Sequence, residues 1–146
     1  MSLPFVSRSA HAALETKMGE LNQEYQNFRR RNASVREDAY RQGGSDAIAA
    51  LLPVYDNLKL AREQPCQDKD FRTGIELTLQ SLLKSLADLG VAEIPAEGQP
   101  FDPRLHEAVE HIEDPQYGEG MVVRVIRTGF VREGVVLRHT LVAVAN

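Results

Sequence analysis

The chain has 146 residues, of which 42% are hydrophobic and 26% are charged. This length fits one ordinary domain or two small ones, and the balanced composition excludes a large multidomain enzyme, a disordered chain and a collagen-like repeat. The 17 basic and 21 acidic residues give a formal net charge of −4, which is a poor electrostatic match for nucleic acid.

Two further properties concern the compartment. No apolar run approaches the roughly 18 residues of a membrane span, and the first residues lack the basic and apolar segments of a secretion signal. The single cysteine, Cys66, cannot form an internal disulfide, which fits a reducing compartment. We therefore expect a cytoplasmic protein that binds neither a membrane nor nucleic acid.

The first third of the chain carries a heptad pattern. Its apolar positions alternate at spacings of four and three, which is the seam of a coiled coil and suits pairing with one partner helix. A polar residue at one of these positions, Asn32, lowers stability but favours a parallel dimer. The pattern predicts a long helix to about Gln42 that forms a homodimer through Leu14, Met18, Leu21, Tyr25, Phe28, Asn32 and Val35.

Two adjacent glycines follow this helix. Gly43 and Gly44 each cost about 1 kcal/mol relative to alanine inside a helix, and Ser45 is a suitable N-cap for a new one. The sequence therefore predicts a break or soft kink there, with a second helix over about 46–63. Pro53 lies inside that second helix, removes one backbone hydrogen bond and is expected to bend it.

The second helix and a third one are expected to form an antiparallel hairpin. A loop at 64–68 precedes the third helix, over about 70–89, and Gly90 is typical of the residue just past a helix C-terminus. Each arm has one apolar face, and two such faces enclose little surface. Pairing of two hairpins into a four-helix bundle is the economical solution, with a dimer contact through Leu51, Leu58, Leu79, Leu82 and Leu86.

The last third of the chain has the pattern of a small β domain. Asp102-Pro103 predicts a short capped helix to about Glu110. The runs 121–128 and 135–145 are rich in valine, isoleucine and leucine, and Glu133-Gly134 between them is a weak hairpin signal. Strands are therefore expected after about residue 120.

Taken together, these segments predict an α+β fold in three parts. A long N-terminal coiled-coil helix occupies 1–45, a helical hairpin that forms a four-helix bundle in the dimer occupies 46–90, and a small C-terminal β domain occupies 91–146.

The histidines and carboxylates do not form a recognisable chemical motif. His106 and His111 miss the spacing that places two metal ligands on one helical face, and no third ligand accompanies them. His106 is instead expected to pack against Phe101. The carboxylates between Glu107 and Asp114 lack the partner groups of a catalytic site. We therefore expect no metal, no cofactor and no enzyme.

The basic run Arg29-Arg30-Arg31 lies within the heptads. Acidic residues, Glu37 and Asp38, follow it, unlike the basic arm of a DNA-binding zipper protein. An exposed flank of the coiled coil and a patch that binds a partner protein both remain open.

Several segments together resemble the GrpE family, the nucleotide exchange factors of DnaK-type chaperones. Each segment is a weak signal alone, but their order and separations over residues 20 to 146 are specific. They are 25–31, 51–58, 74–79, 89–91, 100–109, 129–130, 137–138 and 142–146.

The resemblance implies a function without bond chemistry. Members of this family form homodimers and bind the nucleotide-binding domain of a DnaK-type chaperone, mainly through one β domain with further contacts from the helices, so that ADP leaves. A protein that binds the open chaperone more tightly than the ADP-bound one must lower ADP affinity by the same factor. The paired helices of the family are also thought to act as a thermal switch.

The resemblance also suggests contact residues. Arg29 matches an arginine of the long-helix motif, whereas Leu60 stands where the family often has arginine, with basic residues close by. The expected partner-binding residues are Arg29, Lys59, Arg62, Ile126, Arg138, Val142 and Val144. The alternative is a coiled-coil dimeric scaffold that shares the fold and binds another protein without exchanging nucleotide.

Overall fold

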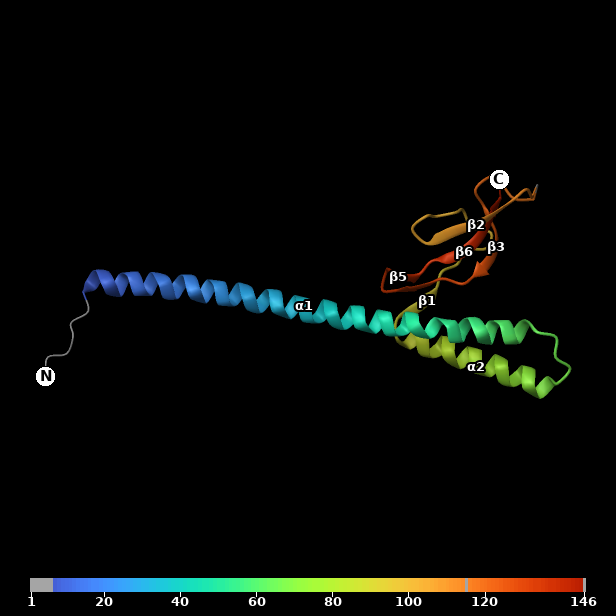
Figure 1. Ribbon diagram of the computed structural model, residues 1–146, viewed down its shortest axis with the longest axis horizontal. Helices are drawn as coiled ribbons and strands as arrows, with labels where there is room; N and C mark the ends of the chain where they lie inside the picture. Colours follow the sequence, from blue (N-terminus) through green and yellow to red (C-terminus); the bar gives the residue numbers. More distant parts are fainter. Residues whose placement is uncertain (1–6, 115, 146) are drawn as a thin grey trace. The chain divides into compact units, whose positions relative to one another are not determined.

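The computed structural model describes residues 7–114 and 116–145. In this part of the chain two helices are followed by six short strands (Figure 1), which confirms the expected α+β fold. The contacts within the chain divide it into two compact units, one that ends at Gly43 and one that begins at Gly44. The second unit holds both the helical hairpin and all the described strands.

Helix α1 (Arg8–Glu63) is 56 residues long and continues through Gly43, Gly44 and Pro53. The prediction of a break at the two glycines, with a new helix capped by Ser45, is therefore wrong. A Cβ on Gly44 would lie 2.8 Å from Nη1 of Arg132, so the missing side chain gives room to this guanidinium. The helix continues because helix propensity is only a weak local preference, which two glycines in a helix of this length do not overcome.

Residues 8–43 of the first unit belong to helix α1. Every described residue up to Gly43 is exposed. The apolar residues of the heptad seam are 55–66% exposed, namely Leu14, Met18, Leu21, Tyr25, Phe28 and Val35. This long helix with an uncovered apolar seam fits the predicted coiled coil.

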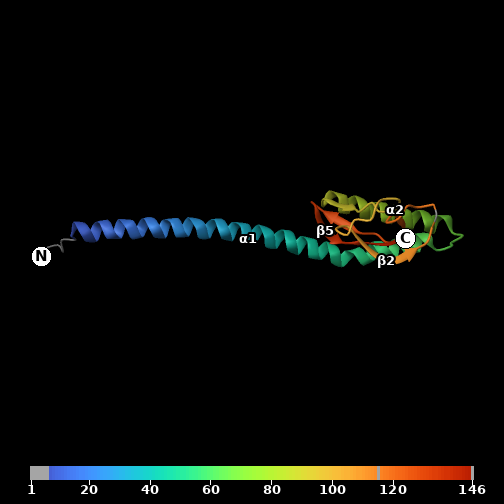
Figure 2. The same ribbon diagram turned by 90° about the horizontal axis from the view of Figure 1, so that it is seen from above.

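Helix α2 (Lys69–Asp88) lies within one residue of the predicted bounds of about 70–89, and Asp68 caps its start. The carboxylate of Asp68 accepts hydrogen bonds from the backbone N–H groups of Asp70 and Phe71, at 2.9 and 3.1 Å. After the helix, Gly90 adopts a positive φ of 75°, which glycine tolerates without strain. Figures 1 and 2 show α2 running back beside the C-terminal part of α1, as the hairpin prediction requires.

The hairpin is packed on strands of its own chain. Its buried side chains share one core with Val91 and Phe130, and they are Ile48, Leu52, Tyr55, Leu79 and Leu86. The assignment of Leu79 and Leu86 to a dimer contact is thereby corrected, because the chain itself covers them. Leu58 and Leu82 are half-buried at the edge of this core, whereas Leu51 is exposed.

The strands form two small sheets. The first is antiparallel, in the order β1-β4-β5, with strands Val91–Glu93, Phe130–Arg132 and Val135–Arg138. The second has the order β2-β6-β3, with strands His106–Ile112, Thr140–Ala145 and Val122–Arg127; β6 is parallel to β2 and antiparallel to β3.

The predicted short helix to Glu110 is absent. Asp102 accepts from the backbone N–H of Arg104 at 2.9 Å, but it closes a turn, and β2 starts at His106. From there the chain pairs with β6, with a bulge between Ala108 and Glu110. The ladder to a strand more than 30 residues away outweighs the local capping signal, which is typical of context overriding propensity.

The hairpin turn at Glu133-Gly134 is confirmed. The two residues have φ values of 49° and 83° and connect β4 with β5. Two successive positive φ values characterise the turn that matches the twist of a two-residue hairpin.

Candidate partner-binding site

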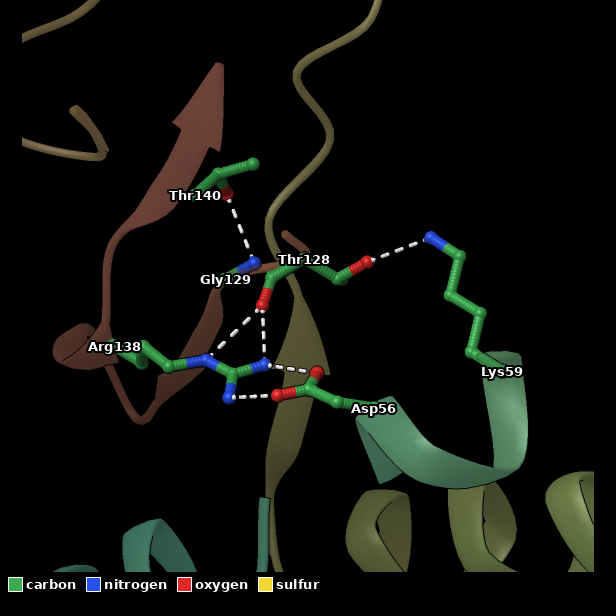
Figure 3. Close-up of polar contacts among 6 residues, drawn as sticks. All are labelled: Asp56, Lys59, Thr128, Gly129, Arg138 and Thr140. Carbon is green, nitrogen blue, oxygen red and sulfur yellow. Dashed lines mark hydrogen bonds and ion pairs between the residues drawn. The ribbon is translucent and has the colours of Figure 1, made fainter. Parts of the chain in front are cut away.

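The most connected polar side chain between the helical arm and the strands is Arg138, at the end of β5. Its Nη1 and Nη2 donate to the two carboxylate oxygens of Asp56 on α1, at 2.7 and 2.8 Å (Figure 3). Nη2 and Nε also donate to the carbonyl oxygen of Thr128, at 2.7 and 3.2 Å. The guanidinium lies 5.7 Å from the ring centre of Phe130.

These contacts turn Arg138 inward. Its side chain is only 15% exposed, so the expectation that it presents its charge to a partner is corrected. A fork-shaped guanidinium with carboxylate and carbonyl partners is among the stronger arrangements of hydrogen bonds in proteins. Asp56, Arg138 and Thr128 are called the Arg138 clamp below.

Two further contacts lie beside the Arg138 clamp. Lys59, one turn further along α1 than Asp56, donates to the hydroxyl oxygen of Thr128 at 3.1 Å. Behind Thr128, the backbone N–H of Gly129 donates to the hydroxyl oxygen of Thr140, also at 3.1 Å (Figure 3). A Cβ on Gly129 would lie 2.4 Å from the backbone nitrogen of Thr140, so only glycine permits this crossing.

Tyr55 connects the same region to β1. Its ring meets Phe130 edge-on, with centroids 5.0 Å apart, and its hydroxyl donates to the carboxylate of Glu93. Burial, and then the hydrogen bond to Glu93, raise the pKa of Tyr55 to about 12. The neutral phenol is therefore the form that the fold stabilises.

A groove of about 400 Å³ runs between α1 and the end of β3. It brings together two residues expected to bind the partner, Lys59 on α1 and Ile126 on β3. Ile126 is 43% exposed at an irregularity in the strand pairing. Asp56, Leu60, Glu63, Val125, Arg127, Thr128 and Leu141 complete the lining.

Arg62 lies on an adjoining groove that shares Lys59 and Thr128 with the first one. Its side chain is 42% exposed and 3.8 Å from the carboxylate of Glu76 on α2. Such an exposed pair contributes little to stability, so the guanidinium is free to exchange partners. Arg29 belongs to the first unit, where it is exposed and lies 5.9 Å from the ring of Tyr25.

The two valines of the last strand are not on the surface. Val142 is fully buried and Val144 nearly so, and both belong to the core under the β2-β6-β3 sheet. Their assignment as direct contacts is corrected, because both side chains are buried in this core. On the other face, Arg124 and Glu110 form an ion pair at 2.5 Å, and both residues are paired with Ala143.

The histidine examined for metal binding serves the turn before β2. Nδ1 of His106 accepts from the backbone N–H of Asp102 at 3.1 Å, and its ring lies 6.0 Å from that of Phe101, which confirms the expected packing. Hydrogen bonds from Arg104 lower the pKa of Asp102 to about 2.

Within residues 7–114 and 116–145, no group of three potential ligand side chains is arranged to hold a metal ion. In the same residues no helix is long and apolar enough to cross a membrane.

Sequence reasoning missed both partners of Arg138. Asp56 and Arg138 are 82 positions apart, and no periodicity connects a helical carboxylate with an arginine at the end of a hairpin. The available signal was the position of Asp56, on the same side of the helix as the buried Leu52 and Tyr55. A charged residue beside a buried face requires a partner.

Comparisons of the sequence with known proteins all give the same family. A sequence model described as GrpE matches residues 7–146. Proteins named Protein GrpE from Clostridium acetobutylicum and Clostridium beijerinckii are 43% and 40% identical, over 92% and 86% of this chain and 66% and 60% of their own length. The Protein GrpE of Synechococcus elongatus is 38% identical over 90% of this chain and 69% of its own length. The chain spans somewhat less than two thirds of the two Clostridium relatives.

Proposed function

Since the chain belongs to the GrpE family, we propose that it is a nucleotide exchange factor for a DnaK-type chaperone. It binds the nucleotide-binding domain of that chaperone and accelerates the release of ADP. The observation that carries this proposal is the family match over residues 7–146, which includes both helices and every described strand.

The proposed mechanism needs only differential binding. If the protein binds the open form of the chaperone more tightly than the ADP-bound form, ADP affinity must fall by the same ratio. No residue has to form or break a covalent bond. A cytoplasmic location follows from the proposed partner.

We further propose that the working form is a homodimer. Six apolar seam residues of the first unit are at least 55% exposed, and a free helix of this kind is marginal in water without a partner helix. The hairpin adds exposed apolar positions at Leu51, Val54 and Phe71. Two chains would cover both surfaces, in a paired helix and in a four-helix bundle. Sedimentation equilibrium at micromolar concentration tests this; the mass of a single chain would contradict it.

The partner surface we propose combines the groove and its basic rim. Lys59, Arg62 and Ile126 are accessible and lie on the two neighbouring grooves, while Arg29 would contribute from the long helix. Arginine and an exposed aliphatic side chain next to a concave surface are typical of binding surfaces. Val125, which lines both grooves, packs against the buried cluster that holds Val142 and Val144.

The test uses the full chain with a DnaK-type chaperone that carries fluorescent ADP. Release of the label should accelerate about tenfold or more, with saturation as the protein is added. Ile126→Asp should weaken this effect. Val109→Asp is the matched control, since Val109 is similarly exposed at 47% and lies outside both grooves.

The alternative is a dimeric scaffold that binds a partner without exchanging nucleotide. It predicts a complex with the chaperone, or with another protein, and an unchanged rate of ADP release at saturation. A role of the long helices as a thermal switch is a further proposal, and it would appear as a fall in exchange before the second unit melts.

A further inference from the structure

The Arg138 clamp connects two elements that the chain itself does not join directly. Asp56 belongs to α1, whereas Arg138 and Thr128 belong to the strands (Figure 3). Along the chain, the helical arm is joined to the first strand, β1, by the short segment Leu89-Gly90. The angle between the arm and the strands therefore depends on noncovalent contacts.

We infer that Arg138 is a positioning residue for chaperone binding: the Arg138 clamp sets the geometry of the groove without touching the chaperone. The inference rests on the proposed function, because it concerns the surface proposed for that function. It replaces the expectation that Arg138 is itself a contact.

The geometry of the groove supports this role. One wall is α1, with Lys59 and Leu60, and the other is the end of β3, with Ile126 and Arg127. Asp56 and Thr128, two members of the clamp, lie in the lining between these walls. A change in the clamp would therefore alter the distance between contact residues on the two walls.

The guanidinium is suited to this task for a chemical reason. It uses Nη1, Nη2 and Nε at once, with the carboxylate on one side and the carbonyl on the other. A lysine ammonium keeps the charge but has no planar fork, so it cannot reproduce this two-sided arrangement. Arg138→Lys is therefore a mild change that loosens the joint and keeps the positive charge.

Preorganisation explains why orientation matters for exchange. Contacts on two walls act together only if their spacing is fixed before binding; otherwise part of the binding free energy is lost in ordering them. A loose joint also lets the protein adapt to the ADP-bound chaperone as well as to the open one. The ratio of the two affinities then falls, and with it the acceleration at saturation.

The first experiment measures the joint directly, without the chaperone. Spin labels are placed at Asn57→Cys on α1 and Val109→Cys on β2, both exposed positions, in a Cys66→Ser background. We expect a broader distance distribution in Arg138→Lys than in the parent. Arg104→Ala is the matched control: its ion pair with Asp102 is local to one turn and 87% exposed on the arginine side, so the distribution should stay unchanged.

The second experiment measures how much saturating protein accelerates ADP release. It compares the parent with Arg138→Lys, Asp56→Asn and the double variant, at a temperature well below the melting temperature of each. Each single variant should lose about tenfold of the acceleration. The double variant should lose no more than either single one, because both changes break the same link. Destabilisation alone would lower the folded fraction but would not reduce the acceleration once folded protein saturates the chaperone.

The outcomes separate the two proposals. With an active parent, unchanged distances in Arg138→Lys would overturn the positioning role while leaving the exchange function in place. Unchanged acceleration in both single variants would do the same. A parent that does not accelerate release would overturn the proposed function and the role of the Arg138 clamp in it. Broadened distances together with reduced acceleration support both.

Discussion

The two units of this chain are stabilised in different ways. Up to Gly43 every described residue is exposed, and the helix presents an apolar seam that no described part of the chain covers. From Gly44 onward the chain buries two clusters of apolar side chains, one under the hairpin and one under the β2-β6-β3 sheet. The difference separates a segment whose apolar side chains stay exposed in the single chain from one that buries its own.

This contrast teaches where stability resides. An isolated helix gains little beyond its own hydrogen bonds, so the first unit should be the first to lose structure when its partner is removed. The second unit contains long-range ladders and buried contacts that do not require another chain. Changes in one unit should therefore leave the other largely intact.

The largest expected effect tests the second unit alone. In Gly129→Ala the added Cβ would lie 2.4 Å from the backbone nitrogen and the hydroxyl oxygen of Thr140, and 2.7 Å from the carbonyl oxygen of Arg138. Backbone atoms cannot yield as a flexible side chain does, so we expect a loss of about 3 kcal/mol in the free energy of unfolding.

Chemical denaturation followed by near-ultraviolet circular dichroism measures this loss. Gly118→Ala is the control, because its nearest neighbour would be a side-chain atom of Met121 at an ordinary 3.9 Å. Equal stability of the two variants would contradict the close approach at Gly129.

The second prediction breaks the first unit and spares the second. Leu21→Asp places a charge in the seam, where leucine is 66% exposed in the single chain. Because the charge keeps a partner helix from covering that site, the variant should lose about 2 kcal/mol per chain in the free energy of dimerisation. We expect a monomer with less helix and an unchanged β-domain signal. Asn27→Asp adds the same charge outside the seam and should remain dimeric; monomers in both variants would mean that the seam does not direct dimerisation.

The sequence predicted the features that depend on neighbouring residues better than those that depend on distant ones. The heptad seam, the terminating Gly90 and the turn at Glu133-Gly134 are local signals, and all but the pairing of the seam are confirmed. Local rules suffice where a residue's role depends on neighbours within a few positions.

Most of the failures involve distant contacts. The helix continues through Gly44, which Arg132 approaches, but also through Gly43, which has no such neighbour among the described residues. His106 starts a strand because β6 lies beside it. Arg138 turns inward because Asp56, 82 positions earlier, accepts its hydrogen bonds. A single sequence contains no local pattern that specifies such pairs. The resemblance could therefore suggest which residues bind a partner, but the sequence could not show which of them are exposed.

The third prediction uses the pKa of Tyr55 to probe the junction of hairpin and strands. Because this pKa is raised from 10.0 to about 12, the folded state retains the phenolic proton better than the unfolded state. The resulting stability is fully present below pH 10 and is lost as the pH rises from about 10 to 12. Tyr55→Phe should lack this pH dependence and cost about 1 kcal/mol at neutral pH through the lost hydrogen bond to Glu93. Denaturation curves of both proteins at pH 8 and above provide the comparison; parallel pH profiles would contradict the assignment.

The smallest expected effect lies at the boundary of the two units. Among the described residues, a Cβ on Gly43 would meet no atom within 4 Å, whereas one on Gly44 would approach Nη1 of Arg132 at 2.8 Å. Gly43→Ala should therefore raise the helix stability by about 0.5–1 kcal/mol, since alanine has the higher helix propensity and no contact opposes it. Gly44→Ala should gain less, because the guanidinium of Arg132 must move aside.

If the long helices melt before the second unit, calorimetry should show two transitions, and Gly43→Ala should raise only the lower one. This result would place the weakest part of the paired helices beside the glycines, although the single chain is helical there. One cooperative transition in both proteins, or a shift confined to the upper transition, would show instead that the first unit does not melt independently. In that case the division at Gly43 would describe contacts within the chain but not a separate step of unfolding.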